Sequence, residues 1–137
     1  MESRQHLEQL YREAIYEVDL PAGTVAFQVG AALPPALPVP LALVSAWNPG
    51  NERPGEPTNR AANRRLEAEL ARRGLPFFPA RGRDEAGAHV EPSFAIVGIL
   101  REDALALARS FGQAAVVYAV AGGAELLWCE AGPAASA

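Results

Sequence analysis

The sequence of 137 residues contains no lysine, one cysteine and two histidines, and it has no long apolar run. Because Cys129 has no second cysteine to pair with, an internal disulfide is excluded, which fits a reducing compartment. The longest apolar stretch, 41–47, is too short to span a bilayer. The N-terminus is charged and lacks the apolar centre of a signal peptide. We therefore expect a cytoplasmic protein without a membrane partner.

The sequence also lacks the common motifs of catalysis and cofactor binding. Two histidines, His6 and His89, and one cysteine at these spacings give no zinc pattern. No serine has a paired histidine and acid in a recognisable arrangement, and no Gly-x-Ser-x-Gly turn occurs. A glycine-rich phosphate loop and a dinucleotide fingerprint are both missing. We expect neither a metal site nor a cofactor, and the sequence leaves open whether the protein is an enzyme.

Arginine supplies all of the basic side-chain charge, and most of it falls in one segment. Twelve arginines oppose sixteen acidic residues, which gives a net charge of −4. Residues 53–83 hold eight arginines and three glutamates, a charge of +5, so the rest of the chain carries −9. The segment is either a solvated helix face or a local field that attracts an anionic ligand. Arg60 and Arg81 are the arginines that we expect to contact such a ligand, because their planar groups suit anions.

Periodicity and turn residues predict a chain of alternating helices and strands. Apolar residues at helical spacing indicate an amphipathic helix over 3–17. Further helices are expected over 58–73 and 101–111, each followed by a glycine. The expected strands cover residues 24–30, 41–47, 75–81, 93–100, 114–120 and 124–128. Prolines favour an edge position for strand 75–81, whereas the apolar strands 41–47 and 93–100 should be central.

The order of these elements predicts the fold class. From residue 41 to 120 the order is strand-helix-strand-strand-helix-strand, which is the ferredoxin-like βαββαβ arrangement. We therefore expect one α+β domain over 1–130 with an extra N-terminal helix and strand. A C-terminal edge strand should lie beside 114–120, and 131–137 should form a flexible tail. The place where strand 24–30 joins the sheet is left open.

This topology brings seven residues from distant parts of the sequence to one edge of the sheet. Strand 41–47 runs in one direction and strands 93–100 and 114–120 run in the other, so the end of the first strand meets the starts of the others. The residues at this rim are Trp47, Asn48, Asn59, Asn63, Glu91, Ser93 and Gln113. Because binding and catalytic groups concentrate at element ends on a rigid scaffold, we predict a ligand site there.

The two helical asparagines have a structural and a functional interpretation. Asn59 and Asn63 lie in line with Leu66 on the predicted helix, so their amides should face the sheet and not solvent. A half-buried amide needs hydrogen-bond partners. These partners are either the backbone of the 48–57 loop or a polar ligand near the helix N-terminus.

The other rim residues have similar alternatives. Glu91 is either a loop carboxylate paired with an arginine or a general acid or base. Trp47 either packs at the rim or stacks on a planar ring of a ligand. Gln113 is either a turn residue or a ligand contact, and Ser93 and Asn48 complete the predicted binding set.

Four short motifs together resemble a bacterial family known as domain of unknown function 3293. They are Ala46-Trp47-Asn48-Pro49, Asn59-x-x-x-Asn63-x-x-Leu66-x-x-x-Leu70, Glu91-Pro92-Ser93-Phe94 with Gly98-Ile99, and Phe111-Gly112-Gln113-x-Ala115. The resemblance covers roughly residues 20–128. Ala114 and His89 depart from it, because an asparagine and a tryptophan are expected there, and a family site that used that asparagine would be altered in this chain. The family name carries no activity, so the resemblance supports positions and not a reaction.

Three functions are compatible with these observations. The first is binding of a polar or anionic small molecule, such as a nucleotide-like one, at the rim, because amides and arginines outnumber proton-transfer groups. The second is a small enzyme in which Glu91 acts as general acid or base. The third is a protein- or nucleic-acid-interaction module that uses the arginine segment 53–83. We do not expect nucleic acid to be the main partner, and we leave a homodimer open.

Overall fold

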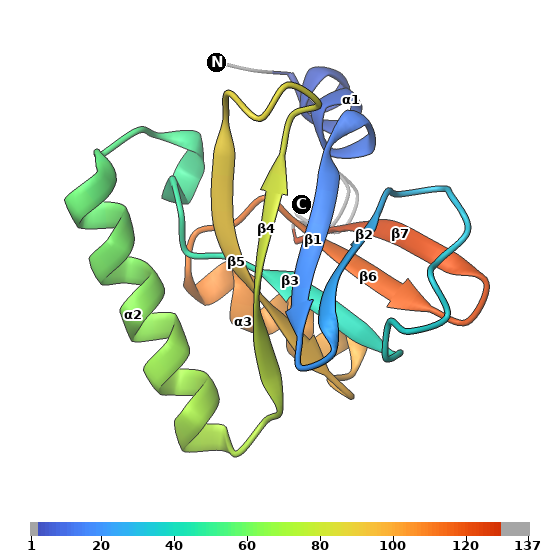
Figure 1. The fold of residues 1–137 in the computed structure, drawn as a ribbon. Coiled ribbons are helices and arrows are strands. Elements are labelled where there is room, and N and C mark those ends of the chain that lie inside the picture. The colour runs from blue at the N-terminus through green and yellow to red at the C-terminus, as the bar shows by residue number, and fades with distance from the viewer. Residues whose placement is uncertain (1–2, 130–137) are drawn as a thin grey trace.

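The computed structural model describes residues 3–129. This part of the chain contains both helices and strands, as Figure 1 shows. In chain order they are α1 (Arg4–Glu13), β1 (Ile15–Leu20), β2 (Gly23–Phe27), β3 (Leu41–Val44), the short 3-10 helix η1 (Pro49–Asn51), α2 (Glu56–Arg73), β4 (Phe77–Arg83), β5 (Val90–Val97), α3 (Arg101–Ser110), β6 (Ala115–Val120) and β7 (Gly123–Trp128). The expected tail, 131–137, lies outside the described residues, and the domain boundary at residue 130 stays a prediction.

The described strands form one antiparallel sheet with the order β2-β1-β4-β5-β3-β6-β7. Four consecutive strands, β4-β5-β3-β6, have the order that the ferredoxin-like arrangement requires, with α2 and α3 in its two connections. The predicted α+β class is therefore confirmed. β7 lies beside β6, as expected. β2 joins the sheet through β1, which pairs with β4.

The N-terminal helix is shorter than predicted, and a strand follows it. α1 ends at Glu13, and Ile15–Leu20 form β1 in place of the last helical turn. The prediction of a helix over 3–17 was wrong there because the apolar residues of 14–18 fit both a helical stripe and strand alternation. Pairing with β2 and β4 favours the strand, since it leaves Tyr16 6% exposed and Val18 fully buried.

β4 contradicts the expected edge position of the proline-containing strand. It lies between β1 and β5. Pairing with β5 extends along the whole of β4, whereas pairing with β1 stops at Ala80, opposite Val18. Pro79, which has no N–H to donate, therefore lies where β4 has a neighbour on one side only. Pro79 thus occupies an edge position locally, as expected for proline, although β4 as a whole is not an edge strand.

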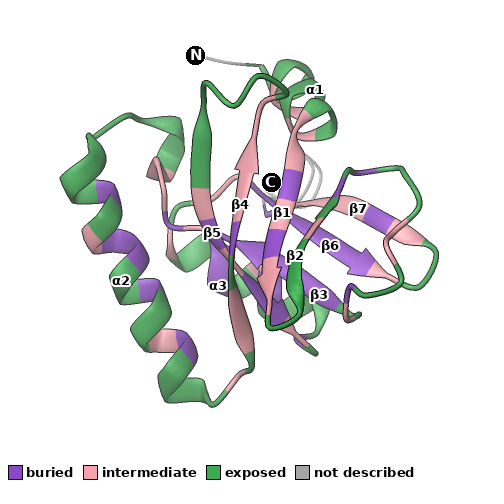
Figure 2. Ribbon diagram, viewed as in Figure 1, coloured by how far each residue is buried: buried purple, intermediate pink, exposed green. Residues whose placement is uncertain are grey.

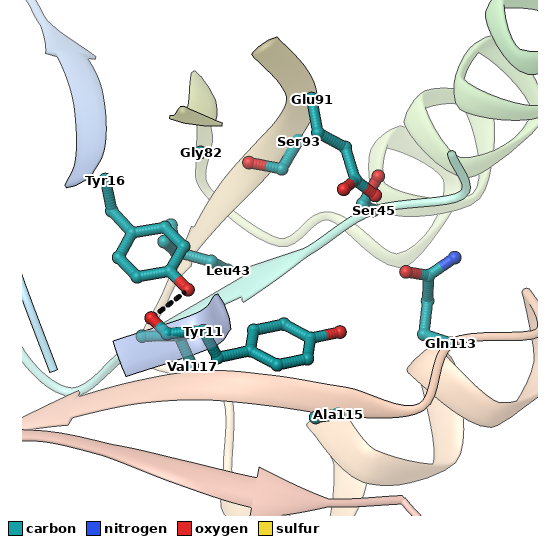
Figure 3. A pocket seen from close by; sticks show the side chains of 10 residues that line it. All are labelled: Tyr11, Tyr16, Leu43, Ser45, Gly82, Glu91, Ser93, Gln113, Ala115 and Val117. Carbon is teal, nitrogen blue, oxygen red and sulfur yellow. Dashed lines mark hydrogen bonds between the residues drawn. The ribbon is translucent and has the colours of Figure 1, made fainter. Parts of the chain in front are cut away.

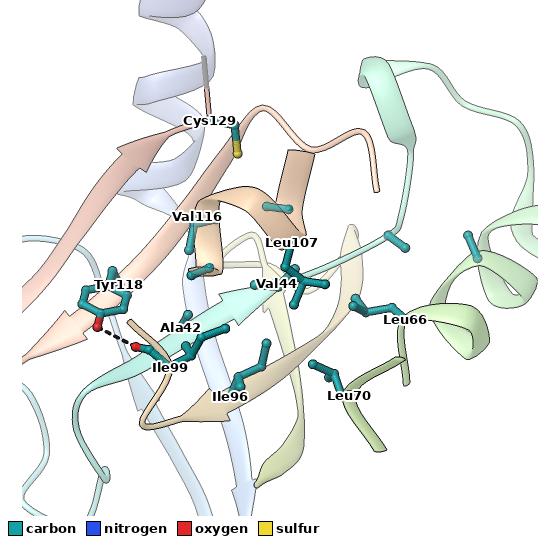
Figure 4. Packing of buried hydrophobic residues seen from close by; sticks show 14 residues of the cluster. Ala42, Val44, Leu66, Leu70, Ile96, Ile99, Leu107, Val116, Tyr118 and Cys129 are labelled. Atoms are coloured by element: carbon teal, nitrogen blue, oxygen red, sulfur yellow. Dashed lines mark hydrogen bonds between the residues drawn. The ribbon is translucent and has the colours of Figure 1, made fainter. Parts of the chain in front are cut away.

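One face of the sheet is covered by α2 and α3. Ala42, Val44, Ile96 and Val116 point to this face, because they alternate with their neighbours along β3, β5 and β6. Leu66 and Leu70 of α2 and Leu107 of α3 pack against them, as shown in Figure 4. The buried positions of α2 recur on its inner side in Figure 2. None of the described helices combines the length and apolarity needed to cross a membrane.

The other face of the sheet is closed by the sheet itself. Its core contains Tyr16 and Val18 of β1 together with Val117 of β6 and Ala124 of β7, from opposite ends of the strand order. The two ends approach because the sheet curls, and Figure 1 shows β1 and β2 in front of β6 and β7. The Gly30 N–H donates a hydrogen bond of 3.1 Å to the Ala124 carbonyl across the gap. We call this side of the sheet the concave face.

Candidate functional site

The loop that leaves β3 is held in place by the side chains of Asn63 in α2 and of Ser45 in the loop itself. Asn63 of α2 accepts a hydrogen bond of 2.8 Å from the Ala46 N–H and donates one of 3.2 Å to the Pro92 carbonyl. Ser45 donates to the same Pro92 carbonyl at 2.8 Å and accepts from the Trp47 N–H at 2.9 Å. The loop after β3, α2 and the start of β5 are thus joined by three hydrogen bonds.

Asn48 and Asn59 form a reciprocal pair a short distance along the same loop. The Asn59 Oδ1 atom accepts from the Asn48 N–H, and its Nδ2 donates to the Asn48 Oδ1, both at 2.8 Å. Asn48 adopts the left-handed conformation, with φ of 49°. Asparagine tolerates that conformation better than most residues, and the pair with Asn59 adds a reason for it here.

The α3–β6 connection completes this arrangement. The Gln113 Nε2 atom donates to the carbonyls of Trp47 and Phe111, each at 3.2 Å. The Gly50 N–H donates to the Gly112 carbonyl at 2.8 Å. A Cβ atom on Gly112 would lie 2.7 Å from the Cβ of Pro49, so the two loops touch too closely for any other residue. We call the side-chain amides of Asn48, Asn59, Asn63 and Gln113 the amide frame.

The amide frame resolves the two interpretations of the asparagines in this structure. Asn59 is 2% exposed and Asn63 is 8% exposed, and both bond the neighbouring loop. Both asparagines therefore have the structural role, in which their amides bond the loop and not a ligand. Neither of them, nor Asn48, lines the hollow described below. Trp47 is half-buried and contributes its backbone N–H and carbonyl to the arrangement.

The two arginines of the predicted site lie elsewhere. Arg60 is exposed and forms an ion pair of 3.5 Å with Glu56, one turn earlier on α2. Arg81 points away from the concave face and bonds Glu17 at 2.8 Å and Asp19 at 3.0 Å across the β1–β4 pair. Both arginines therefore have acidic partners, and neither lines the hollow.

A small hollow of about 60 Å³ lies on the concave face at the end of the sheet near α1. Figure 3 shows the side chains around it. The lining residues are Tyr11, Tyr16, Leu43, Ser45, Gly82, Glu91, Ser93, Gln113, Ala115 and Val117. Most occur in pairs two residues apart, because alternate residues of a strand point to the same face. The topology thus brings together three of the predicted site residues, namely Glu91, Ser93 and Gln113.

Glu91 is the one carboxylate among the lining residues. The residue as a whole is exposed near the start of β5, but Figure 3 shows its carboxyl group turned inward toward Ser45. Burial of this group raises the pKa of Glu91 from 4.5 to about 7, while the Ser45 hydroxyl and the charge of Arg53 oppose the rise. Because part of the Glu91 residue contacts solvent, the rise of its pKa is smaller than full burial would cause. Glu91 can therefore hold or release a proton near neutral pH.

Ser93 differs from every other polar side chain of the site. It is 9% exposed, and its Oγ atom is buried without a hydrogen-bond partner within the described part of the chain. Figure 3 shows the hydroxyl pointing into the hollow. Ser45 lines the same hollow but uses its hydroxyl twice, as donor and as acceptor. Buried polar groups are nearly always paired in folded proteins, so the Ser93 hydroxyl is a candidate contact for a ligand.

Two tyrosines that the sequence did not indicate complete the hollow. The Tyr16 hydroxyl donates a hydrogen bond of 2.8 Å to the Tyr11 carbonyl. The Tyr11 ring packs edge-on against Trp128, with 6.3 Å between the ring centroids. Burial first, and the Glu91 charge to a smaller extent, raise the pKa of both phenols, so both stay protonated. Tyr16 was missed because its strand was assigned to a helix. The alternation of Tyr16 and Val18 was the signal that could have found it.

A protein-family model described as "Protein of unknown function (DUF3293)" matches residues 44–116, just over half of the chain. The chain belongs to the DUF3293 family. No curated protein and no solved structure matches it. The DUF3293 match runs from the end of β3 into β6 and includes the amide frame together with Ser45, Glu91 and Ser93. Tyr11 and Tyr16 lie outside the match, so the hollow joins the family segment to the N-terminal part of the chain.

The chemistry of the hollow is set by oxygen atoms. Within residues 3–129, no group of three or more histidine, cysteine, aspartate and glutamate side chains is placed to hold a metal ion. The lining offers a single carboxyl group, one amide and four hydroxyls, those of Ser45, Ser93, Tyr11 and Tyr16. Such a set can hold a polar group by hydrogen bonds, and Glu91 can exchange a proton with it.

Proposed function

We propose that this DUF3293 protein binds a small polar molecule, or the polar end of a larger one, in the hollow beneath α1. The observation that carries the proposal is the buried, unpartnered hydroxyl of Ser93 beside the inward-turned carboxyl of Glu91. An unpaired buried hydroxyl costs about 1–3 kcal/mol, and a ligand that bonds it recovers part of that free energy.

The size of the hollow limits what it can bind. Pockets for drug-sized ligands have volumes of roughly 300–1,000 Å³. The hollow, at about 60 Å³, has room for a group of a few non-hydrogen atoms. The support is therefore for a small polar group and not for the whole nucleotide-like ligand that the sequence suggested.

The lining also argues against an anionic ligand. No arginine faces the hollow, and the predicted contacts Arg60 and Arg81 are paired with acidic residues outside it. On α2, the helix of the basic segment, Arg72 and Arg73 both pair with Glu69. The positive charge of the basic segment is thus partly neutralised, and Arg53, which does not line the hollow, is the arginine whose charge acts on Glu91.

A second function is an enzyme in which Glu91 is the general acid or base. A specific observation favours it, because burial brings the pKa of Glu91 to about 7, where a carboxyl group transfers protons efficiently at neutral pH. The two functions differ in the Glu91→Gln variant. A binding protein should lose affinity, whereas an enzyme should keep affinity for its substrate and lose turnover.

The binding proposal can be tested by NMR spectroscopy of the labelled protein with three small probes: ethylammonium chloride, acetamide and sodium acetate. At least one probe should cause saturable shifts of the backbone amide signals of Ser45, Ser93, Gln113 and Val117. Ser93→Ala should weaken this binding about fivefold, since it removes one hydrogen bond of about 1 kcal/mol. Ser110→Ala is the matched control, because Ser110 bonds the Leu107 carbonyl on α3. Absence of saturable shifts with all three probes, or equal affinity in Ser93→Ala, would contradict the proposal.

A further inference from the structure

The polar groups of the hollow differ in whether they still have a hydrogen atom to donate. Gln113 shows this most clearly. Its Nε2 donates to two backbone carbonyls, those of Trp47 and Phe111, at 3.2 Å each. A carbonyl oxygen only accepts hydrogen bonds, so the amide cannot be reversed without losing both. The Oε1 atom must therefore point the other way, and Figure 3 shows it directed toward the hollow.

Two hydroxyls of the hollow have also used their hydrogen atoms. The Tyr16 hydroxyl donates to the Tyr11 carbonyl at 2.8 Å, and the Ser45 hydroxyl donates to the Pro92 carbonyl at 2.8 Å. What each offers to a ligand is lone pairs of oxygen. With Gln113 Oε1, three neutral groups of the lining are thus acceptors toward a ligand, since the one hydrogen of Ser45 goes either to the Pro92 carbonyl or to the Glu91 carboxylate. Only Ser93 and Tyr11 have hydroxyls that no such carbonyl bond commits as donors.

The charge of the lining, like its hydrogen-bond acceptors, favours a ligand that is a cation. Glu91 is the one ionisable acid in the lining, and the lining contains no arginine, lysine or histidine. Burial disfavours the Glu91 carboxylate and raises its pKa, although Ser45 and the charge of Arg53 oppose that rise. A cation in the hollow would compensate that charge, whereas an anion would meet a carboxylate and three fixed acceptors.

The two tyrosine rings form part of the wall of the hollow. Tyr16 lies directly over Gly82, where an added Cβ would be 3.0 Å from its Cε1 atom, so the ring packs against the β4 backbone at the wall of the hollow. Tyr11 forms another part of the wall, and Figure 3 shows its hydroxyl end directed toward Gln113.

We infer that the hollow receives a primary ammonium group, whose three N–H donors bond the Glu91 carboxylate, the Gln113 Oε1 and the hydroxyl oxygens of the lining. The inference rests on the proposed function and specifies the chemical class of the ligand: a small amine, or a molecule that ends in one. A hollow of about 60 Å³ holds such a group and a short part of its carbon chain. A metal ion fits less well, because hard cations select several carboxylate or carbonyl ligands and the lining has one carboxylate.

The test compares three probes of similar size and different charge on the intact protein. Ethylammonium chloride, acetamide and sodium acetate are each titrated while the backbone amides and the Glu91 side-chain carboxyl carbon are followed by NMR. Potassium chloride at equal concentration serves as the ionic-strength control. Ethylammonium should bind in the millimolar range, since three non-hydrogen atoms permit about that affinity at best. At saturation it should lower the pKa of Glu91 by about one unit, which corresponds to tenfold tighter binding to the ionised form.

Two glutamine variants separate the charge of Glu91 from the general charge of the protein. Glu91→Gln should weaken ethylammonium binding about tenfold and leave any acetamide binding within about twofold. Glu85→Gln is the matched control, because Glu85 is exposed in the β4–β5 connection and does not line the hollow. It should leave both affinities unchanged.

The outcomes distinguish the inference from the function on which it rests. Binding of acetamide or acetate in the hollow without ethylammonium would overturn the ammonium inference and leave the binding function supported. Equal shifts with ethylammonium chloride and potassium chloride would also overturn it. Binding of none of the three probes would overturn both. If Glu91→Gln does not fold, the fall in the Glu91 pKa of the wild-type protein decides the matter.

Discussion

Two polar regions lie at the same end of this sheet, and they use their hydrogen-bonding groups differently. In the amide frame, Asn59 and Asn63 are nearly fully buried, and each satisfies both ends of its amide within the protein. In the hollow, Ser93 is as well buried but has no partner among the described residues, and Glu91 turns a carboxyl group inward. The frame is complete without a ligand, and the hollow is not.

The comparison shows why polar residues at strand ends need not share one role. Some replace missing backbone partners where a loop leaves the sheet, as the asparagines do for Ala46 and Asn48. Others stay available for a ligand. Gln113 belongs to both groups, because its NH2 closes the frame while its oxygen faces the hollow. The predictions below test whether the two regions differ as the hydrogen bonds indicate.

The largest effect is expected at Asn63. Asn63→Ala should lower the free energy of unfolding by about 3 kcal/mol, because it leaves the buried Ala46 N–H without a partner and removes a bond to Pro92. Urea unfolding at equilibrium measures the change. Arg64→Ala, the exposed neighbour on α2, should stay within about 0.5 kcal/mol of the wild-type value. A loss of less than about 1 kcal/mol in Asn63→Ala would show that the frame is not structural.

The contact between the two loops of the frame gives a second, smaller effect. Gly112 and Gly74 have nearly the same left-handed conformation, with φ of 73° and 69°. Gly74→Ala should cost about 1 kcal/mol from that conformation alone, because nothing lies within 4 Å of the added Cβ. Gly112→Ala should cost at least about 1 kcal/mol more, since its Cβ would meet Pro49. Equal losses in thermal or urea unfolding would mean that the loops separate easily.

Replacing each serine of the hollow by alanine should change the free energy of unfolding in opposite directions. Ser45→Ala removes two hydrogen bonds and should lower the free energy of unfolding by about 1–2 kcal/mol. Ser93→Ala removes a buried hydroxyl without a partner and should raise it, by up to about 1 kcal/mol, in the absence of ligand. Paired urea titrations of the two variants check this. If Ser93→Ala destabilises the protein as much as Ser45→Ala, the Ser93 hydroxyl is already satisfied.

A further effect concerns the dependence of stability on pH. The pKa of Glu91 is raised from 4.5 to about 7 in the folded protein, so the folded state holds this proton more tightly than the unfolded chain. The resulting stabilisation is fully present below pH 4.5 and is lost as the pH rises through about 7. Glu91→Gln cannot ionise and should gain stability relative to the wild type across that window. Unfolding midpoints of the wild type and of Glu91→Gln at several pH values measure this difference.

Much of the fold was predictable because its signals are local. The apolar strands β3 and β5 and the glycines after α2 and α3 indicated the βαββαβ core. β1 was missed because residues 14–18 satisfy two periodicities at once, and only the neighbouring strands β2 and β4 choose between them. The position of β4 was missed because the proline rule applies to one residue, Pro79, and not to the strand that contains it.

The candidate site was predictable in its place but not in the roles of its residues. Glu91, Ser93 and Gln113 do meet at one end of the sheet, as the strand directions required. Whether a polar atom is bonded or available depends on distances of a few tenths of an ångström, which no sequence pattern contains. The opposite states of Ser45 and Ser93 in one hollow show this directly.

The central claim is that the hollow holds an inward-turned carboxyl group whose charge the protein stabilises only in part, through Ser45 and Arg53. The most direct test follows the side-chain carboxyl carbon of Glu91 by NMR, with Glu91→Gln to assign the signal, from about pH 4 to about pH 9 in the absence of ligand. The structure predicts a titration midpoint near 7, well above the ordinary value of 4.5. A midpoint close to 4.5 would show a solvated carboxylate and would contradict the account.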